Sequence, residues 1–398
     1  MGDLALEDVY KVFRDGTEAV ADLNLYVEDG SFFVLLGPSG SGKTTVLRLV
    51  AGLEHPTEGR VLIGGRDVTE LSPRSRDVAM VFQHYAVYPH MTVYDNIAFG
   101  VRVRHLDKEE VDRRVRGAAT MLGLEDVLKK KPGSLSGGQL QRVALGRALV
   151  REPQAFLMDE PMSNVDTRFR AQLRGELARI QRDVAVTTLY VTHDQAEAMT
   201  LGDHVGVLRD GVLQQVDTPK GLYDRPRNLF VAGFVGSPPM NLAEATVDED
   251  DSGMVLIFGG HRVRIDGETL GRRPGLRTYA RKQVVIGIRP EDVTDEVTAA
   301  VPEAARMRVA VARCETVGPD TYTQFVIDAP LLLAEDPREA VDDVDADDDA
   351  TPWPAERVNL WMARTSSPAP SPGDAIELTF RPGRLYAFDP RTGDAIEG

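Results

Sequence analysis

Residues 37–45 read GPSGSGKTT, and this run constrains the fold more than any other segment of the chain. It fits the pattern G-x-x-x-x-G-K-[ST], in which the glycines let backbone N–H groups curl around phosphate oxygens. The lysine of the pattern adds a point charge, and the hydroxyl that follows it suits Mg²⁺. The pattern therefore predicts a phosphate-binding loop for a nucleotide, formed by Gly37, Pro38, Ser39, Gly40, Ser41, Gly42, Lys43, Thr44 and Thr45.

The flanking residues separate this loop from an ordinary glycine-rich turn. Residues 31–36 (SFFVLL) form an apolar run of strand length, and residues 44–53 (TTVLRLVAGL) place apolar side chains at helical spacing. A strand, a glycine loop and a helix start are the order that a phosphate site needs, because the helix N-terminus attracts anions.

The overall composition is that of a water-soluble protein with more than one domain. A length of 398 residues makes two domains the natural expectation, and 42% of the residues are hydrophobic. The apolar runs are about six residues long, whereas a membrane helix needs about 20. The N-terminus lacks the pattern of a signal peptide, so we expect a cytoplasmic protein. Cys314 is the only cysteine, which excludes disulfides within the chain and cysteine-rich zinc sites.

The net charge of −16 argues against nucleic acid as a partner. Half of the excess lies in residues 335–350 (EDPREAVDDVDADDDA), which hold nine acidic residues and one arginine. We expect an acidic, solvated insertion there. A calcium loop is the alternative, because acidic residues occupy its positions 1, 3, 5 and 12, but Ala350 stands where such a loop needs glycine. The four candidate ligands are Asp345, Asp347, Asp349 and Glu356.

The first part of the chain, residues 1–235, alternates apolar strand-like runs with helical stretches, which is typical of an α/β domain. A helical block at about residues 88–150 interrupts this alternation, and we interpret it as an inserted helical subdomain. The clearest strand-like runs are residues 31–36, 78–82, 155–158, 188–191 and 204–208.

The second part, residues 236–398, changes character at the segment GSPP. Short strand-like runs recur between turn residues, and helical periodicity is nearly absent, so we expect a small, barrel-like all-β module. The runs are residues 254–258, 262–265, 284–288, 306–312, 322–327, 358–362, 375–380 and 385–388.

Two carboxylates and a histidine at strand ends are candidates for the chemistry of the site. Asp159 and Glu160 end the apolar run AFLMDE, where Asp159 suits an outer-shell role at Mg²⁺ and Glu160 suits a general base. His193 follows the run TLYVT and is placed to contact the γ-phosphate. Each has a plainer interpretation, since acids at strand ends also aid solubility and a lone histidine is usually structural.

Two further segments fit the same chemistry. Gln83 follows the run VAMVF and is a candidate ligand of Mg²⁺, although a surface glutamine on its own is weak support. The segment LSGGQ, residues 135–139, places a serine and two glycines at a helix start, which is a second anion-binding arrangement or simply a good N-cap. Its candidate ligand-binding residues are Ser136, Gly137, Gly138 and Gln139.

Taken in order, these motifs resemble those of the ATP-binding cassette (ABC) ATPases over residues 3–235. The resemblance implies a P-loop NTPase fold, with a RecA-like core and an inserted helical subdomain. It also implies ATP and Mg²⁺ as cofactors, with Thr44, Gln83 and Asp159 at the metal. Phe13 resembles the aromatic residue that stacks on adenine, with a core phenylalanine as the alternative. Asp166, in the segment SNVD, resembles the loop that crosses the dimer interface.

A finer resemblance is to the ATPase subunits of bacterial sugar importers of the maltose, trehalose and glycerol-phosphate type. Residues 80–100, 190–203, 230–241 and 287–292 carry it, and it thins after about residue 295. It implies an OB-like regulatory β domain after the cassette. It also implies a homodimer in which Ser136 and Gly138 of one subunit close over ATP held by the other.

The partners that this resemblance implies are two transmembrane permease subunits and an extracytoplasmic solute-binding protein. The chain would then sit on the inner face of the cell membrane, held through the region after Gln83 that includes Tyr85 and Ala86. Other solutes, namely polyamine, iron or glycerol phosphate, remain open. So do a soluble ABC ATPase of DNA repair or translation and a β domain that binds a regulatory protein or ligand.

Overall fold

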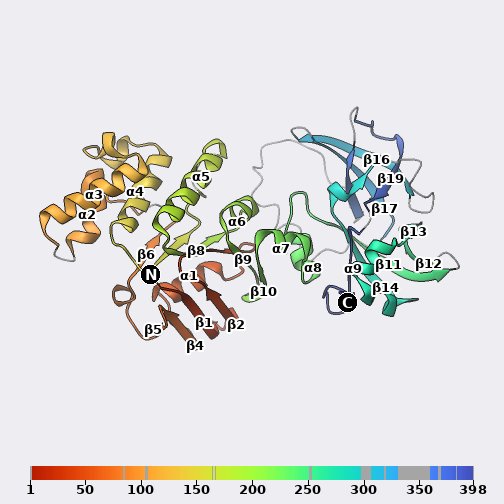
Figure 1. The fold of residues 1–398 in the computed structure, drawn as a ribbon, viewed down its shortest axis with the longest axis horizontal. Helices are drawn as coiled ribbons and strands as arrows, with labels where there is room; N and C mark the ends of the chain where they lie inside the picture. Colours follow the sequence, from red (N-terminus) through yellow and green to blue (C-terminus); the bar gives the residue numbers. More distant parts are fainter. Residues whose placement is uncertain are drawn as a thin grey trace. The chain divides into compact units, whose positions relative to one another are not determined.

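The computed structural model describes residues 2–83, 86–103, 106–163, 165, 167–250, 253–296, 306–317, 320–329, 359–365, 369–381 and 383–397. It divides into two compact units, Met1–Gly221 and Leu222–Gly398 (Figure 1). The division falls inside helix α7 (Pro219–Asp224), ahead of the glycine-proline segment at residues 236–239.

A six-stranded sheet forms the centre of the first unit, with strand order β10-β9-β3-β8-β7-β6. The strands from β9 to β6 are parallel, and β10 joins the edge antiparallel to β9. Because parallel strands end at the same edge, the segments that follow β3, β8, β7 and β6 meet there. The strands are β3 (Phe32–Leu36), β6 (Val78–Val81), β7 (Ala155–Asp159), β8 (Thr187–Thr192), β9 (His204–Arg209) and β10 (Val212–Asp217).

Strand β3 is buried at every position, as its unbroken apolar sequence FFVLL predicts for a central parallel strand. Helix α1 (Lys43–Ala51) follows it and packs against β7 and β8. Helices α5 (Thr167–Val184) and α6 (Gln195–Leu201) contact each other, and α6 also contacts β3 and β8. The five strands expected in this part of the sequence are confirmed.

A second, antiparallel sheet with order β2-β1-β4-β5 belongs to the same unit (Figure 1). Its strands β1 (Leu4–Val12), β2 (Glu18–Val27) and β4 (Glu58–Ile63) alternate buried and exposed residues over much of their length. Strand β5 (Arg66–Asp67) is short, and the 3₁₀ turn η1 (Pro73–Ser75) follows it. The buried faces of this sheet, β3 and α1 form one hydrophobic core.

The inserted helical block contains α2 (Val93–Arg102), α3 (Lys108–Leu122) and α4 (Gly137–Leu149), which contact one another. Each begins at a capping residue that accepts a hydrogen bond from its own first turn, namely Thr92, Asp107 and Ser136. The 3₁₀ turns η2 (Glu125–Val127) and η3 (Pro132–Ser134) connect α3 to α4.

The second unit holds a five-stranded sheet, order β13-β12-β11-β14-β20, and a closed barrel, order β15-β18-β17-β16-β19. Helix α8 (Leu229–Phe234) precedes them, and α9 (Gly267–Arg272) lies between β13 and the 3₁₀ turns η4 (Pro274–Tyr279) and η5 (Pro290–Asp292). The expected barrel-like β module is confirmed, and each of the eight predicted runs coincides with a strand. The strands are β11 (Asn241–Asp250), β12 (Gly253–Phe258), β13 (His261–Arg264), β14 (Gln283–Ile288), β15 (Val293–Thr294), β16 (Arg306–Val317), β17 (Asp320–Ile327), β18 (Asn359–Thr365), β19 (Ala375–Phe380) and β20 (Leu385–Phe388).

One buried core joins the sheet and the barrel of this unit, and it includes the fully buried Trp361. The Trp361 ring packs on Phe258, Phe325 and Phe380, and its Nε1 donates to the carbonyl oxygen of Leu242 at 3.2 Å. The acidic segment at residues 335–350 and the calcium candidates Asp345, Asp347, Asp349 and Glu356 lie outside the described residues.

Candidate nucleotide-binding site

The glycine-rich loop connects the end of β3 to the start of α1, as its sequence context predicted. Two of its glycines lie against other strands. A β-carbon at Gly37 would collide with the carbonyl oxygen of Leu208 on β9, and one at Gly42 with that of Ala19 on β2. Gly42 also has φ of 97°, a conformation that side chains disfavour. Both positions therefore require glycine for this path of the chain.

Lys43 lies inside the loop, where its side chain is buried. Its Nζ donates to the carbonyl oxygens of Gly37 at 2.9 Å and Pro38 at 2.7 Å. Burial lowers the pKa of Lys43, while the negative charges of Glu160 and Asp159 act in the opposite direction. The ammonium group therefore lies at the N-terminus of α1, where a bound phosphate would add a compensating negative charge.

Thr44 and Asp159 form the best-defined oxygen pair of the site. Oγ1 of Thr44 donates to Oδ1 of Asp159 at 3.0 Å. Burial raises the pKa of Asp159, the bond from Thr44 opposes that rise, and the charge of Glu160 adds to it. A hydroxyl and a carboxylate oxygen are ligands that Mg²⁺ accepts, so the donor set fits this ion.

Glu160 and His193 lie face to face at the ends of β7 and β8. Nδ1 of His193 is 3.1 Å from Oε1 of Glu160. Burial disfavours the charged carboxylate, but the hydrogen bond and charge of His193 and the charge of Lys43 outweigh it, so the pKa of Glu160 falls below its ordinary value. Glu160 has φ of 41°, which turns the chain sharply as it leaves the strand.

Gln83 and Phe13 lie at the margins of the site. Gln83 is exposed and follows β6, whose end lies next to that of β7. Phe13 follows β1 and is half-buried, and Nζ of Lys11 lies over its ring at 5.0 Å from the centroid.

The serine-glycine segment is on the inserted helical block and not beside the phosphate loop. Ser136 caps α4 in a capping box, since its Oγ accepts from the N–H of Gln139, whose side chain accepts from the N–H of Ser136. Ser136 and Gly137 are exposed. Helix α4 contacts α2, α3 and β6, whereas α1 contacts β7 and β8. Asp166 lies outside the described residues.

A buried carboxylate behind the strand ends was missed in the sequence. Oε2 of Glu197, on α6, accepts hydrogen bonds from the hydroxyls of Tyr190 and Thr192, both at 2.7 Å. Burial raises the pKa of Glu197 despite these two bonds. Because Thr192 immediately precedes His193, this group supports the turn that carries the histidine. The only sequence signal for Glu197 was its position shortly after His193. An acidic residue at such a position is ordinary in a helix.

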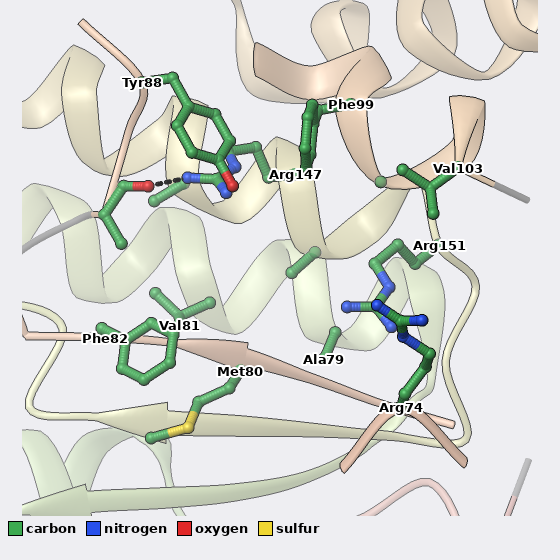
Figure 2. A pocket seen from close by; sticks show the side chains of 14 residues that line it. Arg74, Ala79, Met80, Val81, Phe82, Tyr88, Phe99, Val103, Arg147 and Arg151 are labelled. Carbon is green, nitrogen blue, oxygen red and sulfur yellow. Dashed lines mark hydrogen bonds between the residues drawn. The ribbon is translucent and has the colours of Figure 1, made fainter. Parts of the chain in front are cut away.

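A cavity of about 480 Å³ opens between β6 and helices α2 and α4 (Figure 2). The Arg147 guanidinium lies over the ring of Tyr88, 4.6 Å from its centroid, and donates to the carbonyl oxygen of Ala86. Arg74 and Arg151 reach into the same cavity from its other end. Tyr85, which the sequence placed in this region, lies outside the described residues.

Comparison with known proteins identifies the family. Residues 20–163 match the family described as "ABC transporter", and residues 236–293 match the "MalK OB fold domain". The trehalose/maltose import ATP-binding protein MalK of Thermococcus litoralis is 51% identical over 329 residues, which cover 80% of this chain and 86% of that protein. The trehalose import ATP-binding protein SugC of Mycobacterium tuberculosis is 44% identical over 404 residues, which cover 99% and 98%.

The chain belongs to the ATP-binding subunits of ABC transporters. It is accordingly an ATPase whose cassette is followed by an OB-fold domain, as the sequence resemblance implied. A solved structure of cbiO1 from Clostridium perfringens, described as part of the ABC transporter complex cbiONQ, has a TM-score of 0.52 and 27% identity. The matched region covers 55% of this chain and 89% of the cbiO1 chain. Among the described residues of this ABC ATP-binding subunit, no helix combines the length and apolarity needed to cross a bilayer.

Proposed function

We propose that this ABC ATPase powers carbohydrate import, with two copies of the chain closing around ATP and Mg²⁺. The observation that carries the ATPase assignment is the meeting of the ends of β3, β7 and β8 at one edge of the sheet, which gathers Lys43, Thr44, Asp159, Glu160 and His193. Trehalose and maltose are the first solutes to test, since the similar proteins carry those names.

The proposed roles follow from the chemistry of each group. Lys43 and the loop amides bind the phosphates, and Gly37 and Gly42 keep that loop in shape. Glu160, whose lowered pKa keeps it ionised at neutral pH, accepts the proton of the attacking water. His193, held by its bond to Glu160, positions that water. Catalysis then rests mainly on positioning and charge stabilisation.

Thr44, Asp159 and Gln83 would hold Mg²⁺. When bound, the ion would neutralise negative charge on the β- and γ-phosphates. The bond between Thr44 and Asp159 already holds the two oxygens together. Burial raises the pKa of Asp159, and the charge of a bound cation would oppose that rise.

In the proposed dimer, Ser136, Gly137, Gly138 and Gln139 of one copy close over the ATP held by the other. Their position supports this role, because the cap of α4 is exposed and lies on the helical block rather than beside Lys43 of the same chain. Asp166 would cross the same interface, and Phe13 would stack on adenine. A two-fold dimer would thus complete two sites with one kind of contact.

The cavity beside β6 is the proposed binding site for the permease subunits. Three large apolar side chains that line it are exposed to solvent, with exposed fractions of 42% for Phe82, 37% for Phe99 and 59% for Val103. Exposed apolar side chains gathered at a cavity are typical of a protein–protein contact. The chain would therefore be peripheral on the inner membrane face, held by two permease subunits that work with an extracytoplasmic solute-binding protein.

Three measurements test these proposals separately. The purified chain should release phosphate from ATP only with Mg²⁺, and gel filtration with ATP should detect a dimer in the slowly hydrolysing Glu160→Gln variant. Uptake of labelled trehalose and maltose is then followed in cells whose only copy is wild type or Glu160→Gln. Uptake that needs the active copy supports sugar import. Loss of putrescine, ferric iron or glycerol phosphate uptake instead would assign one of the alternative solutes.

A further inference from the structure

Arg170, on helix α5, bridges the two segments that carry the candidate catalytic pair. Its Nε donates to the carbonyl oxygen of Val165 at 3.0 Å, and its Nη2 donates to that of Ser163 at 3.2 Å. Its Nη1 lies 3.9 Å from Oδ2 of Asp194. One guanidinium group thus reaches both the segment after β7 and the turn after β8.

The first of these segments is fixed directly to Glu160. Both the backbone N–H and the Oγ of Ser163 donate to the carbonyl oxygen of Glu160, at 3.2 Å and 2.9 Å. A shift of Ser163 would therefore pull on the backbone of Glu160. Arg170 holds the carbonyl end of Ser163 and so restrains this shift.

The second segment carries the histidine. Asp194 immediately follows His193, and its backbone N–H donates to Oγ1 of Thr192 at 2.9 Å. Its carboxylate also caps α6 by accepting from the N–H of Glu197 at 3.1 Å. The bonds to Glu197 and Thr192 restrain Asp194, and the charge of Arg170 within ion-pair range adds to this restraint on the residue next to His193.

We propose that Arg170 is a positioning residue for ATP hydrolysis, which keeps Glu160 and His193 in contact by tying the segments that follow them to one rigid helix. The inference rests on the proposed roles of that pair. Arginine suits the task because its planar guanidinium offers several donors in fixed directions. Lysine would offer one rotating ammonium group and could not reach two carbonyl oxygens and a carboxylate with the same geometry.

The test compares Arg170→Ala and Arg170→Lys with Arg179→Ala, which removes an exposed arginine from the same helix. For each protein, kcat, KM for ATP, the affinity for a fluorescent ATP analogue and the thermal midpoint are measured. We expect kcat to fall about 10-fold or more in both Arg170 variants, since misplacement of reacting groups acts on the chemical step. Nucleotide affinity should change less than about 2-fold, and Arg179→Ala should match wild type on every measure.

A double-variant cycle adds a second readout. Asp194→Asn keeps a good N-cap for α6 but removes the charge that faces Arg170. The loss in Arg170→Ala combined with Asp194→Asn should be smaller than the product of the two single losses. The inference is overturned if Arg170→Ala keeps wild-type kcat, if it loses affinity and kcat together with a lowered midpoint, or if the double variant is multiplicative. A wild-type chain that does not hydrolyse ATP would overturn the proposed function instead, so the two failures are distinguishable.

Discussion

Nδ1 of His193 lies 3.1 Å from Oε1 of Glu160, although 33 positions separate the two residues in the chain. The parallel pairing of β7 with β8 brings them together, because each follows the carboxyl end of its strand. The contact has an electrostatic consequence, since it lowers the pKa of a half-buried carboxyl that burial alone would raise. The histidine, together with the charge of Lys43, therefore favours the ionised form of the proposed base.

Replacing Glu160 by glutamine should keep ATP binding and slow turnover at least about 100-fold, because the amide cannot accept the proton. Phosphate release and nucleotide affinity are measured in parallel. Asp183→Asn, which neutralises an exposed acid on α5, is the matched control and should hydrolyse ATP as wild type does. Normal turnover in Glu160→Gln would assign the base to another group.

Phe13→Ala should weaken ATP binding more than it slows hydrolysis. Lys11 lies over one face of the ring, so the other face is the one that we propose stacks on adenine. Titration with a fluorescent ATP analogue gives the affinity, and kcat at saturating ATP gives the chemistry. Tyr26→Ala removes an exposed aromatic ring from β2 and should leave both values unchanged. An unchanged affinity in Phe13→Ala would indicate that this side chain packs within the protein and does not contact ATP.

Arg76→Met should cost about 3 kcal/mol of unfolding free energy. The buried guanidinium donates to the carbonyl oxygens of Leu49 at 2.6 Å and Val50 at 3.1 Å, at the end of α1, and to that of Thr69 at 2.7 Å. Methionine fills the space but leaves these oxygens unpaired. Urea denaturation measures the change. The control Arg74→Met, at an exposed neighbour, should unfold at the wild-type midpoint.

Glu197→Gln should flatten the pH dependence of stability. Burial raises the native pKa of Glu197 above its ordinary value of 4.5, so between these two values the folded state binds more protons than the unfolded chain. Its contribution to stability is therefore lost as pH rises through that window. Unfolding free energies from pH 4.5 to pH 8 should fall less steeply in the variant. A slope equal to that of wild type and of Glu109→Gln, an exposed control, would contradict this assignment.

Arg147→Ala should reduce solute uptake while the isolated subunit keeps its ATPase activity. The guanidinium fixes Tyr88 and the carbonyl of Ala86 at the cavity proposed to hold the permease. Its removal should loosen that wall without touching Lys43 or Glu160. Transport in cells and phosphate release by the purified chain are compared. Equal losses in both assays would place Arg147 in the nucleotide site rather than at a partner surface.

Much of the fold and of the site could be predicted because the informative patterns are local. The phosphate loop is a continuous run, and Asp159, Glu160 and His193 each follow an apolar strand directly. Those strands are buried on both faces, so their apolar runs stand out against polar loops. The strands of the β module were likewise marked by short apolar runs and turns.

The residues that were missed make contacts that leave no pattern in the sequence. Arg76 and Arg170 donate mainly to backbone carbonyl oxygens, and a carbonyl gives no signal in a sequence. Glu197 looked like any acid on an exposed helix face, yet its side chain turns into the core toward Tyr190. Strand β11 was missed because Glu244, Thr246 and Asp248 alternate with its buried residues and interrupt any apolar run.

The close approaches at Gly37 and Gly42 imply that the phosphate loop takes its shape from two directions, with β9 behind one end and β2 behind the other. Efforts to change how this enzyme binds the phosphates of its nucleotide should therefore not be confined to the motif itself. A mutant library aimed at the loop should therefore also vary residues 19–20 and 208–211. A small displacement of the backbone there would move the loop without changing its sequence.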